Sequence, residues 1–249
     1  GERKMAADDF ITNLRENFRQ GNIVTRLLYI NVGAFLICSL VGIILMLFKV
    51  PFSPWMNVLE LPAWWEKFIR QPWSLITYMF MHANFQHIFF NMFAVWMFGR
   101  VLEQVWGPKR FLFYYILCGI GAGLIQEAVQ YIEYVVNFSQ YLESGTEAEA
   151  IFVTEFLNRW ITVGASGAVY AILLAFGMLF PNSQMFVFPI PMPIKAKYFV
   201  IGYAVLELFL GLSGGDGVAH FAHLGGMIFG FILIMYWRKK NNDHGTYYS

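Results

Sequence analysis

The sequence predicts an all-α, polytopic membrane protein, a bundle of six transmembrane helices. Of its 249 residues, 58% are hydrophobic and only 13% are charged, whereas a soluble domain carries about 25% charged residues. Several apolar runs reach the roughly 20 residues that a helix needs to cross the hydrocarbon core. The basic residues also gather in alternate connections between these runs. Composition, run length and charge distribution therefore favour the same fold class.

Six spans are predicted in chain order, over residues 27–48, 87–102, 111–136, 161–180, 198–212 and 218–237. No small-residue cleavage site follows the first span, so we expect it to be retained. The third span carries Gln126, Glu127, Gln130 and Glu133 in its second half, so we expect its far end to project into water. The fourth span ends at Pro181.

The segments outside the spans differ in composition. Residues 1–26 mix both charges without an apolar core, which predicts a cytoplasmic arm rather than a signal peptide. Residues 27–237 are expected to form one six-span membrane domain and 238–249 a cytoplasmic tail. The loop 137–160 is acidic and expected to be solvated. The loop 49–81 contains four tryptophans, Trp55, Trp64, Trp65 and Trp73. This content fits a segment in the headgroup layer.

Basic residues indicate the orientation of the chain. With both termini in the cytoplasm, the inner segments hold 13 of the Lys and Arg residues and the outer segments hold four. Positive charge accumulates on the cytoplasmic side of membrane proteins. We therefore expect an integral, multi-pass protein of the bacterial inner (plasma) membrane with both termini cytoplasmic.

Charge and cysteine content exclude several other classes. A net charge of +1 gives no basic excess for a phosphate backbone, so we expect no nucleic-acid partner. Cys38 and Cys118 each lie in an apolar run without a neighbouring Cys or His at the spacing of metal ligands. We expect no metal ion and no organic cofactor. The lipid bilayer is the expected environment.

Strongly polar side chains inside a span are costly unless they are paired or hydrated, which makes them candidates for function. By helical rise, Ser166 and His223 each lie roughly 7 Å below the outer start of their spans. Glu207 in the fifth span is a further acid at depth, but no residue around it suggests a partner. The polar residues near the outer ends of the second, fourth and sixth spans are His82, His87, Asn91, Ser166, His220 and His223.

Each of these signals has a plainer alternative. A serine in a membrane helix commonly bonds its own backbone, and small residues four apart often serve packing alone. His87 and Asn91, which are four apart and share a helix face, could merely bind helices together. The pair His220 and His223 could ligate a metal, although no carboxylate or cysteine joins it in the sequence. The coincidence of the signals at one depth on three helices favours a catalytic site.

Four short motifs resemble the rhomboid intramembrane serine proteases, between about residues 72 and 237. They are 164–167 (Gly-Ala-Ser-Gly), 82–91 (His-Ala-Asn-Phe-Gln-His-Ile-Phe-Phe-Asn), 222–226 (Ala-His-Leu-Gly-Gly) and 106–112 (Trp-Gly-Pro-Lys-Arg-Phe-Leu). Many family members have Trp-Arg where this chain has Trp73-Ser74. A G-x-S-x-G elbow of soluble hydrolases is absent, because position 168 is Ala.

The resemblance implies a role for each candidate residue. Ser166 would be the nucleophile and His223 the general base, in a dyad without a carboxylate. The Ser166 backbone N–H, His87 and Asn91 would form the oxyanion hole. Supporting roles would fall to Tyr170, packed against the His223 ring, and to His82, which would help to keep the cavity wet.

The predicted function is hydrolysis of a peptide bond in or near a transmembrane segment of another membrane protein. Water would reach a polar pit among the second, fourth and sixth spans from the outer face. The alternatives are an inert relative that binds membrane helices, or a small transporter. Inert relatives usually lack the serine or the histidine, and transporters place polar groups near the midplane on broken helices.

Overall fold

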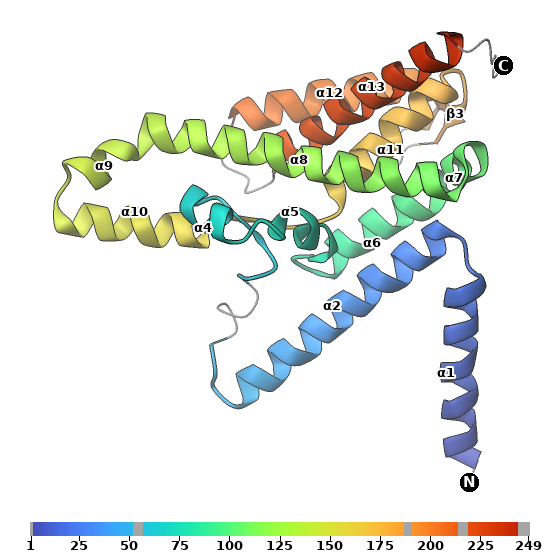
Figure 1. Cartoon of the computed structure of the whole chain (residues 1–249), viewed down its shortest axis with the longest axis horizontal. Coiled ribbons are helices and arrows are strands. Elements are labelled where there is room, and N and C mark those ends of the chain that lie inside the picture. Colours follow the sequence, from blue (N-terminus) through green and yellow to red (C-terminus); the bar gives the residue numbers. More distant parts are fainter. Residues whose placement is uncertain (1, 52–56, 187–190, 214–218, 244–249) are drawn as a thin grey trace.

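The computed structural model describes residues 2–51, 57–186, 191–213 and 219–243, and most of these are helical (Figure 1). Four of the described helices are long and apolar enough to cross a membrane: α2 (Ile23–Leu47), α8 (Pro108–Asn137), α12 (Ala196–Ser213) and α13 (His220–Asp243). The shorter apolar helix α11 (Ser166–Leu179) covers the fourth predicted span. The all-α membrane bundle is confirmed.

The second predicted span is one continuous helical stretch in three parts. It consists of α6 (Phe85–Ala94), a π-helical turn η2 (Val95–Gly99) and α7 (Arg100–Trp106). The Asn84 side chain caps α6 by accepting the N–H of His87 at 2.8 Å. All six predicted spans thus correspond to helices, although several boundaries differ.

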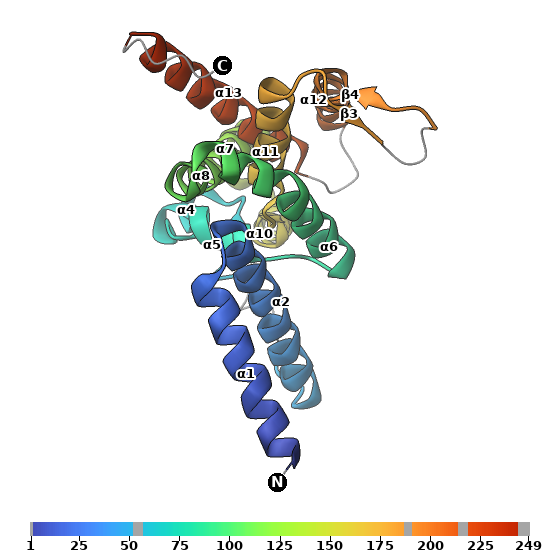
Figure 2. The same ribbon diagram turned by 90° about the vertical axis from the view of Figure 1, so that its right-hand side faces the viewer.

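The helices α1 (Glu2–Gln20) and α2 extend away from the remaining helices in both views (Figures 1 and 2). Only the first part of α2 packs on them, through buried Val24, Leu27 and Asn31. There the buried Glu103 carboxylate accepts the N–H groups of Ile23 and Val24 at 2.8 and 3.0 Å. The second half of α2 exposes its apolar side chains, as a lipid-facing helix does.

The core lies where α8, α11 and α13 pack together. Tyr114 on α8 donates its hydroxyl to the carbonyl of Ala171 on α11 at 2.7 Å. From the loop before α6, buried Tyr78 donates to the carbonyl of Gly119 on α8 at 2.5 Å. These bonds join the central helices to one another and to the loop before α6.

The fourth span begins later than the sequence predicts. Residues Ile161–Thr162 form a short strand, β2, which pairs antiparallel with β1 (Leu61–Pro62). Gly164 then donates its N–H to the carbonyl of Tyr78 at 2.9 Å. Because these long-range bonds hold residues 161–164 extended, the helix starts at Ser166 and not at residue 161.

The loop between the first and second spans is a folded part of the protein. It contains β1, α4 (Trp65–Arg70), α5 (Ser74–Thr77) and a 3₁₀ turn η1 (Tyr78–Phe80). The ring of Trp64 meets Tyr134 on α8 edge-on, at 5.4 Å between centroids. Trp65 and Trp73 are exposed, while Trp55 lies outside the described residues, and the headgroup-layer location of this segment stays a prediction.

This loop covers the second half of α8, so polar residues there are less exposed than the sequence predicts. Gln126, Glu127 and Gln130 are buried, against the expectation that they project into water. Leu61, Leu75 and Tyr78 lie within contact distance of a Cβ placed at Gly123. Glu133 is exposed as expected. Hydropathy alone does not reveal that a distant loop covers a helix face.

The acidic segment 137–160 is helical and not a plain solvated loop. It forms α9 (Ser139–Glu143) and α10 (Glu147–Arg159), and Val153 and Leu157 of α10 are buried. At the start of α10, Thr146 and Glu149 form a capping box. Hydrogen bonds from the Thr146 backbone and side chain hold the pKa of Glu149 below its usual value. Glu149, one of the acidic residues of this segment, therefore stabilises the start of α10.

The last two spans follow a short hairpin. Strand β3 (Gln184–Met185) pairs with β4 (Ile194–Lys195), and α12 follows directly. The expected start of the sixth span at residue 218 lies outside the described residues. Helix α13 continues to Asp243, so the first residues of the expected C-terminal tail are helical.

Candidate active site

Ser166 and His223 lie in hydrogen-bond contact, from helices 57 residues apart in the chain. His223 Nε2 is 2.9 Å from Ser166 Oγ. Ser166 is the first residue of α11 and is half-buried, whereas His223 lies one turn into α13 and is 8% exposed. The depth argument was therefore wrong for Ser166, because a strand precedes it where a helical turn was expected. The N–H of a residue in the first helical turn has no partner within the helix.

A close approach of α11 and α13 makes this contact possible. A Cβ built at Gly226 would lie 1.9 Å from the carbonyl oxygen of Gly167. At such a distance the two helix backbones must move apart before any side chain fits at position 226, so glycine permits the observed spacing. Ala171 of α11 likewise lies 3.3 Å from a Cβ placed at Gly230. Small residues four apart on each helix, Gly167 and Ala171 on α11 and Gly226 and Gly230 on α13, therefore face each other.

The backbone before Ser166 brings a second helix close to it. Gly164 has a φ of +121°, which L side chains rarely adopt. A Cβ at Gly164 would lie 2.6 Å from Cε1 and Nε2 of His87 and 3.6 Å from Ser166 Oγ. Glycine at this position lets the His87 ring lie beside the serine.

Two further predicted site residues flank His87 in the sequence: His82 lies in the loop before α6, and Asn91 lies on α6. Asn91, one turn further along α6, is 5% exposed, and its Nδ2 lacks a hydrogen-bond acceptor among the residues that the structure describes. His82 is buried and meets the His87 ring edge-on at 5.2 Å between centroids. Tyr170 on α11 stacks on the His223 ring, with centroids 4.3 Å apart and planes 8° apart.

One acid of this cluster was missed by the sequence analysis. Glu207 on α12 is 4% exposed, and its Oε2 lies 2.9 Å from Nδ1 of His223 and 2.5 Å from Nδ1 of His220. The Tyr170 hydroxyl donates to its Oε1 at 2.5 Å. The sequence suggested no partner for Glu207 and left its role open, and the structure supplies three partners. The available signal was the presence of an acid inside an apolar span.

Comparison with known proteins identifies the family. A family model described as a rhomboid domain matches residues 69–240, more than two thirds of the chain. The chain belongs to the rhomboid family. This rhomboid domain and the apolar helices make it an integral membrane protein.

Several curated relatives carry rhomboid names. "Rhomboid protease AarA" of Providencia stuartii is 31% identical over 176 residues, which are 68% of this chain and 54% of that protein. "Putative rhomboid protease YdcA" of Bacillus subtilis is 31% identical over 65% of each chain. "RHOMBOID-like protein 12, mitochondrial" of Arabidopsis thaliana is 29% identical over 61% of this chain and 43% of that protein. The chain thus spans about half the length of several relatives, which come from bacteria and mitochondria.

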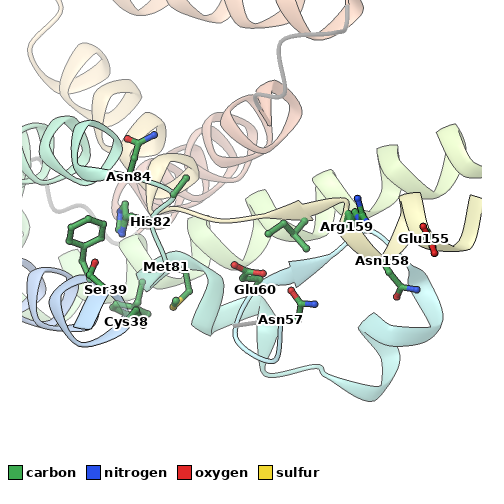
Figure 3. A pocket seen from close by; sticks show the side chains of 14 residues that line it. Cys38, Ser39, Asn57, Glu60, Met81, His82, Asn84, Glu155, Asn158 and Arg159 are labelled. Atoms are coloured by element: carbon green, nitrogen blue, oxygen red, sulfur yellow. The ribbon is translucent and has the colours of Figure 1, made fainter. Parts of the chain in front are cut away.

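A pocket of about 710 Å³ adjoins the rhomboid domain (Figure 3). Some of its lining residues, such as Cys38 and Glu60, lie before residue 69, where the match to the family model begins. Others, such as His82, Asn84 and Arg159, lie within the matched residues. Ser166 and His223 are not among its lining residues. The pocket therefore borders the site through His82, whose ring contacts His87.

Proposed function

We propose that this rhomboid protein is a serine endopeptidase that cleaves transmembrane segments of membrane proteins. The observation that carries the proposal is the 2.9 Å hydrogen bond between Ser166 Oγ and His223 Nε2, in a half-buried position at a helix start. A serine paired with a base at this distance is the requirement for nucleophilic catalysis.

In the proposed mechanism, His223 Nε2 accepts the hydroxyl proton as Ser166 Oγ attacks the scissile carbonyl. The oxyanion receives hydrogen bonds from the Ser166 N–H, His87 and Asn91. When the C–N bond breaks, His223 gives its proton to the leaving amine. Water then attacks the acyl-enzyme with His223 as base, and the acid product leaves with Ser166 regenerated.

Two further observations support these roles. Within the part of the chain that the structure describes, Asn91 Nδ2 is a buried donor without an acceptor. A buried donor of that kind costs free energy until a ligand accepts its hydrogen bond. The parallel Tyr170 ring restricts the His223 ring to one orientation. An inert helix-binding protein or a transporter has no need of a serine bonded to a histidine.

Paired variants test the proposal. Ser166→Ala and His223→Ala should each lower cleavage of a model transmembrane substrate by about 10⁴-fold or more, and the double variant should lose no more than either single one. Wild type should react with a fluorophosphonate at Ser166, whereas both variants should not. The control is Ser74→Ala, which removes a buried hydroxyl on α5 and should keep both cleavage and labelling. Substantial cleavage by folded Ser166→Ala would refute the proposal.

A further inference from the structure

We propose that Glu207 is a positioning residue that fixes the His223 imidazole, so that the dyad is extended by a carboxylate from the neighbouring helix α12. The inference rests on the proposed function and goes beyond it. The resemblance to the family implies a dyad without a carboxylate, and the sequence offers no acid on α13 close to His223.

The first argument concerns the two nitrogens of the His223 ring. Nδ1 lies 2.9 Å from Glu207 Oε2, and Nε2 lies 2.9 Å from Ser166 Oγ. An ionised carboxylate only accepts hydrogen bonds, so Nδ1 must carry the proton of the neutral ring. Nε2 is then the unprotonated nitrogen, which is the one that faces the serine. The carboxylate therefore selects the tautomer that a general base requires.

The second argument concerns how the carboxylate itself is held. Tyr170 donates to Oε1 from α11, while His220 and His223 on α13 both reach Oε2. An acid inside a membrane span is costly unless it is paired, and three partners from two helices supply that pairing. Glu207 is thereby fixed relative to both helices that carry the dyad.

The third argument concerns a metal ion as the alternative occupant. Glu207, His220 and His223 offer donor atoms within 4.8 Å of one another. Glu207 Oε2 lies 2.5 Å from His220 Nδ1 and 2.9 Å from His223 Nδ1, and these are hydrogen-bond distances. The ligands of a tetrahedral zinc ion lie roughly 3.3 Å apart, given bonds of about 2.0 Å. The geometry therefore fits direct hydrogen bonds between Glu207 and the two histidines and not ligation of a zinc ion.

The test compares steady-state constants of the purified full chain with a model transmembrane substrate. Glu207→Gln should lower kcat by about 10- to 100-fold, because a hydrogen bond to a charged group is lost, and should leave KM within about twofold. Glu207→Asp keeps the charge and should recover part of the lost kcat. The matched control is Glu127→Gln, which changes a buried acid on α8, outside the site, and should leave both constants unchanged.

The outcomes separate this inference from the proposed function. If Ser166→Ala is inactive while folded Glu207→Gln turns over at the wild-type rate, the positioning role is refuted and the protease proposal stands. If Ser166→Ala remains active, the protease proposal fails first. Should Glu207→Gln not fold, Tyr170→Phe removes the bond to Oε1 and keeps the stacked ring. An unchanged kcat in both Tyr170→Phe and Glu207→Asp then overturns the inference.

Discussion

At the scale of single residues, the site combines groups that are hydrogen-bonded with buried groups that are not, as judged from the described residues. His223 is held by Ser166, Glu207 and the Tyr170 ring, so its orientation is determined before a substrate binds. Asn91 differs, since its buried Nδ2 lacks an acceptor within the described part of the chain. A donor that is satisfied only by the transition state contributes to kcat and not to substrate binding.

Asn91→Ala should therefore lower kcat by about 10²-fold or less and leave KM nearly unchanged. His87→Ala should behave alike, with a larger loss if its ring also orders water. Steady-state kinetics and the melting temperature in detergent are both measured on each variant. Asn31→Ala is the control, because Asn31 is a buried asparagine on α2 outside the site. A destabilised but fully active Asn91→Ala would remove Asn91 from the site.

At the scale of elements, the contact between α11 and α13 sets the geometry of the dyad. Gly226 faces the Gly167 backbone so closely that no side chain fits between the helices. Helix α12 packs against both α11 and α13 and carries Glu207 to the same histidine. Strand β2 determines where α11 begins and thereby places Ser166 in the first turn.

Gly226→Ala should separate the two helices and lengthen the bond between Ser166 and His223. Overpacking of this kind costs about 1–3 kcal/mol of stability, and we expect the rate of fluorophosphonate labelling to fall by about 10-fold or more. Gly202→Ala on α12 is the matched control, because a Cβ there meets nothing within 4 Å. Equal labelling of both variants would show that the close approach does not serve the site.

At the scale of the whole molecule, the ends of the helices divide between two sides. The start of α2, the α7–α8 turn and the C-terminal end of α13 lie together, at the right in Figure 1. The α9–α10 hairpin lies at the opposite end. This division agrees with the distribution of basic residues along the chain, and we propose that the first side faces the cytoplasm of a bacterial cell.

Single cysteines test this orientation in a variant that lacks Cys38 and Cys118. In intact cells, a membrane-impermeant maleimide should label Ala148→Cys in the first turn of α10 but not Lys240→Cys near the end of α13. Both positions are exposed in the structure. Lysis should make Lys240→Cys reactive and serves as the internal control. Labelling of both cysteines in intact cells would contradict the proposed topology.

The sequence by itself determined the fold class, the approximate spans and the family. Each of these depends on local information: the length of an apolar run, the spacing of small residues, and short motifs such as 164–167. Ser166, His223 and His87 could be named for the same reason. Their chemistry and their positions near the ends of spans are visible without knowing how the helices pack.

Only the tertiary structure decided which polar groups meet. The sequence did not pair Glu207 with any residue, because its partners depend on how α12 is rotated against α11 and α13. It likewise did not show that the loop between the first two spans covers the buried residues Gln126 and Gln130, or that pairing with β1 delays the start of α11 until Ser166. Such contacts join residues far apart in the chain. Periodicity reports which side chains share a face of one helix, whereas packing between elements determines what that face touches.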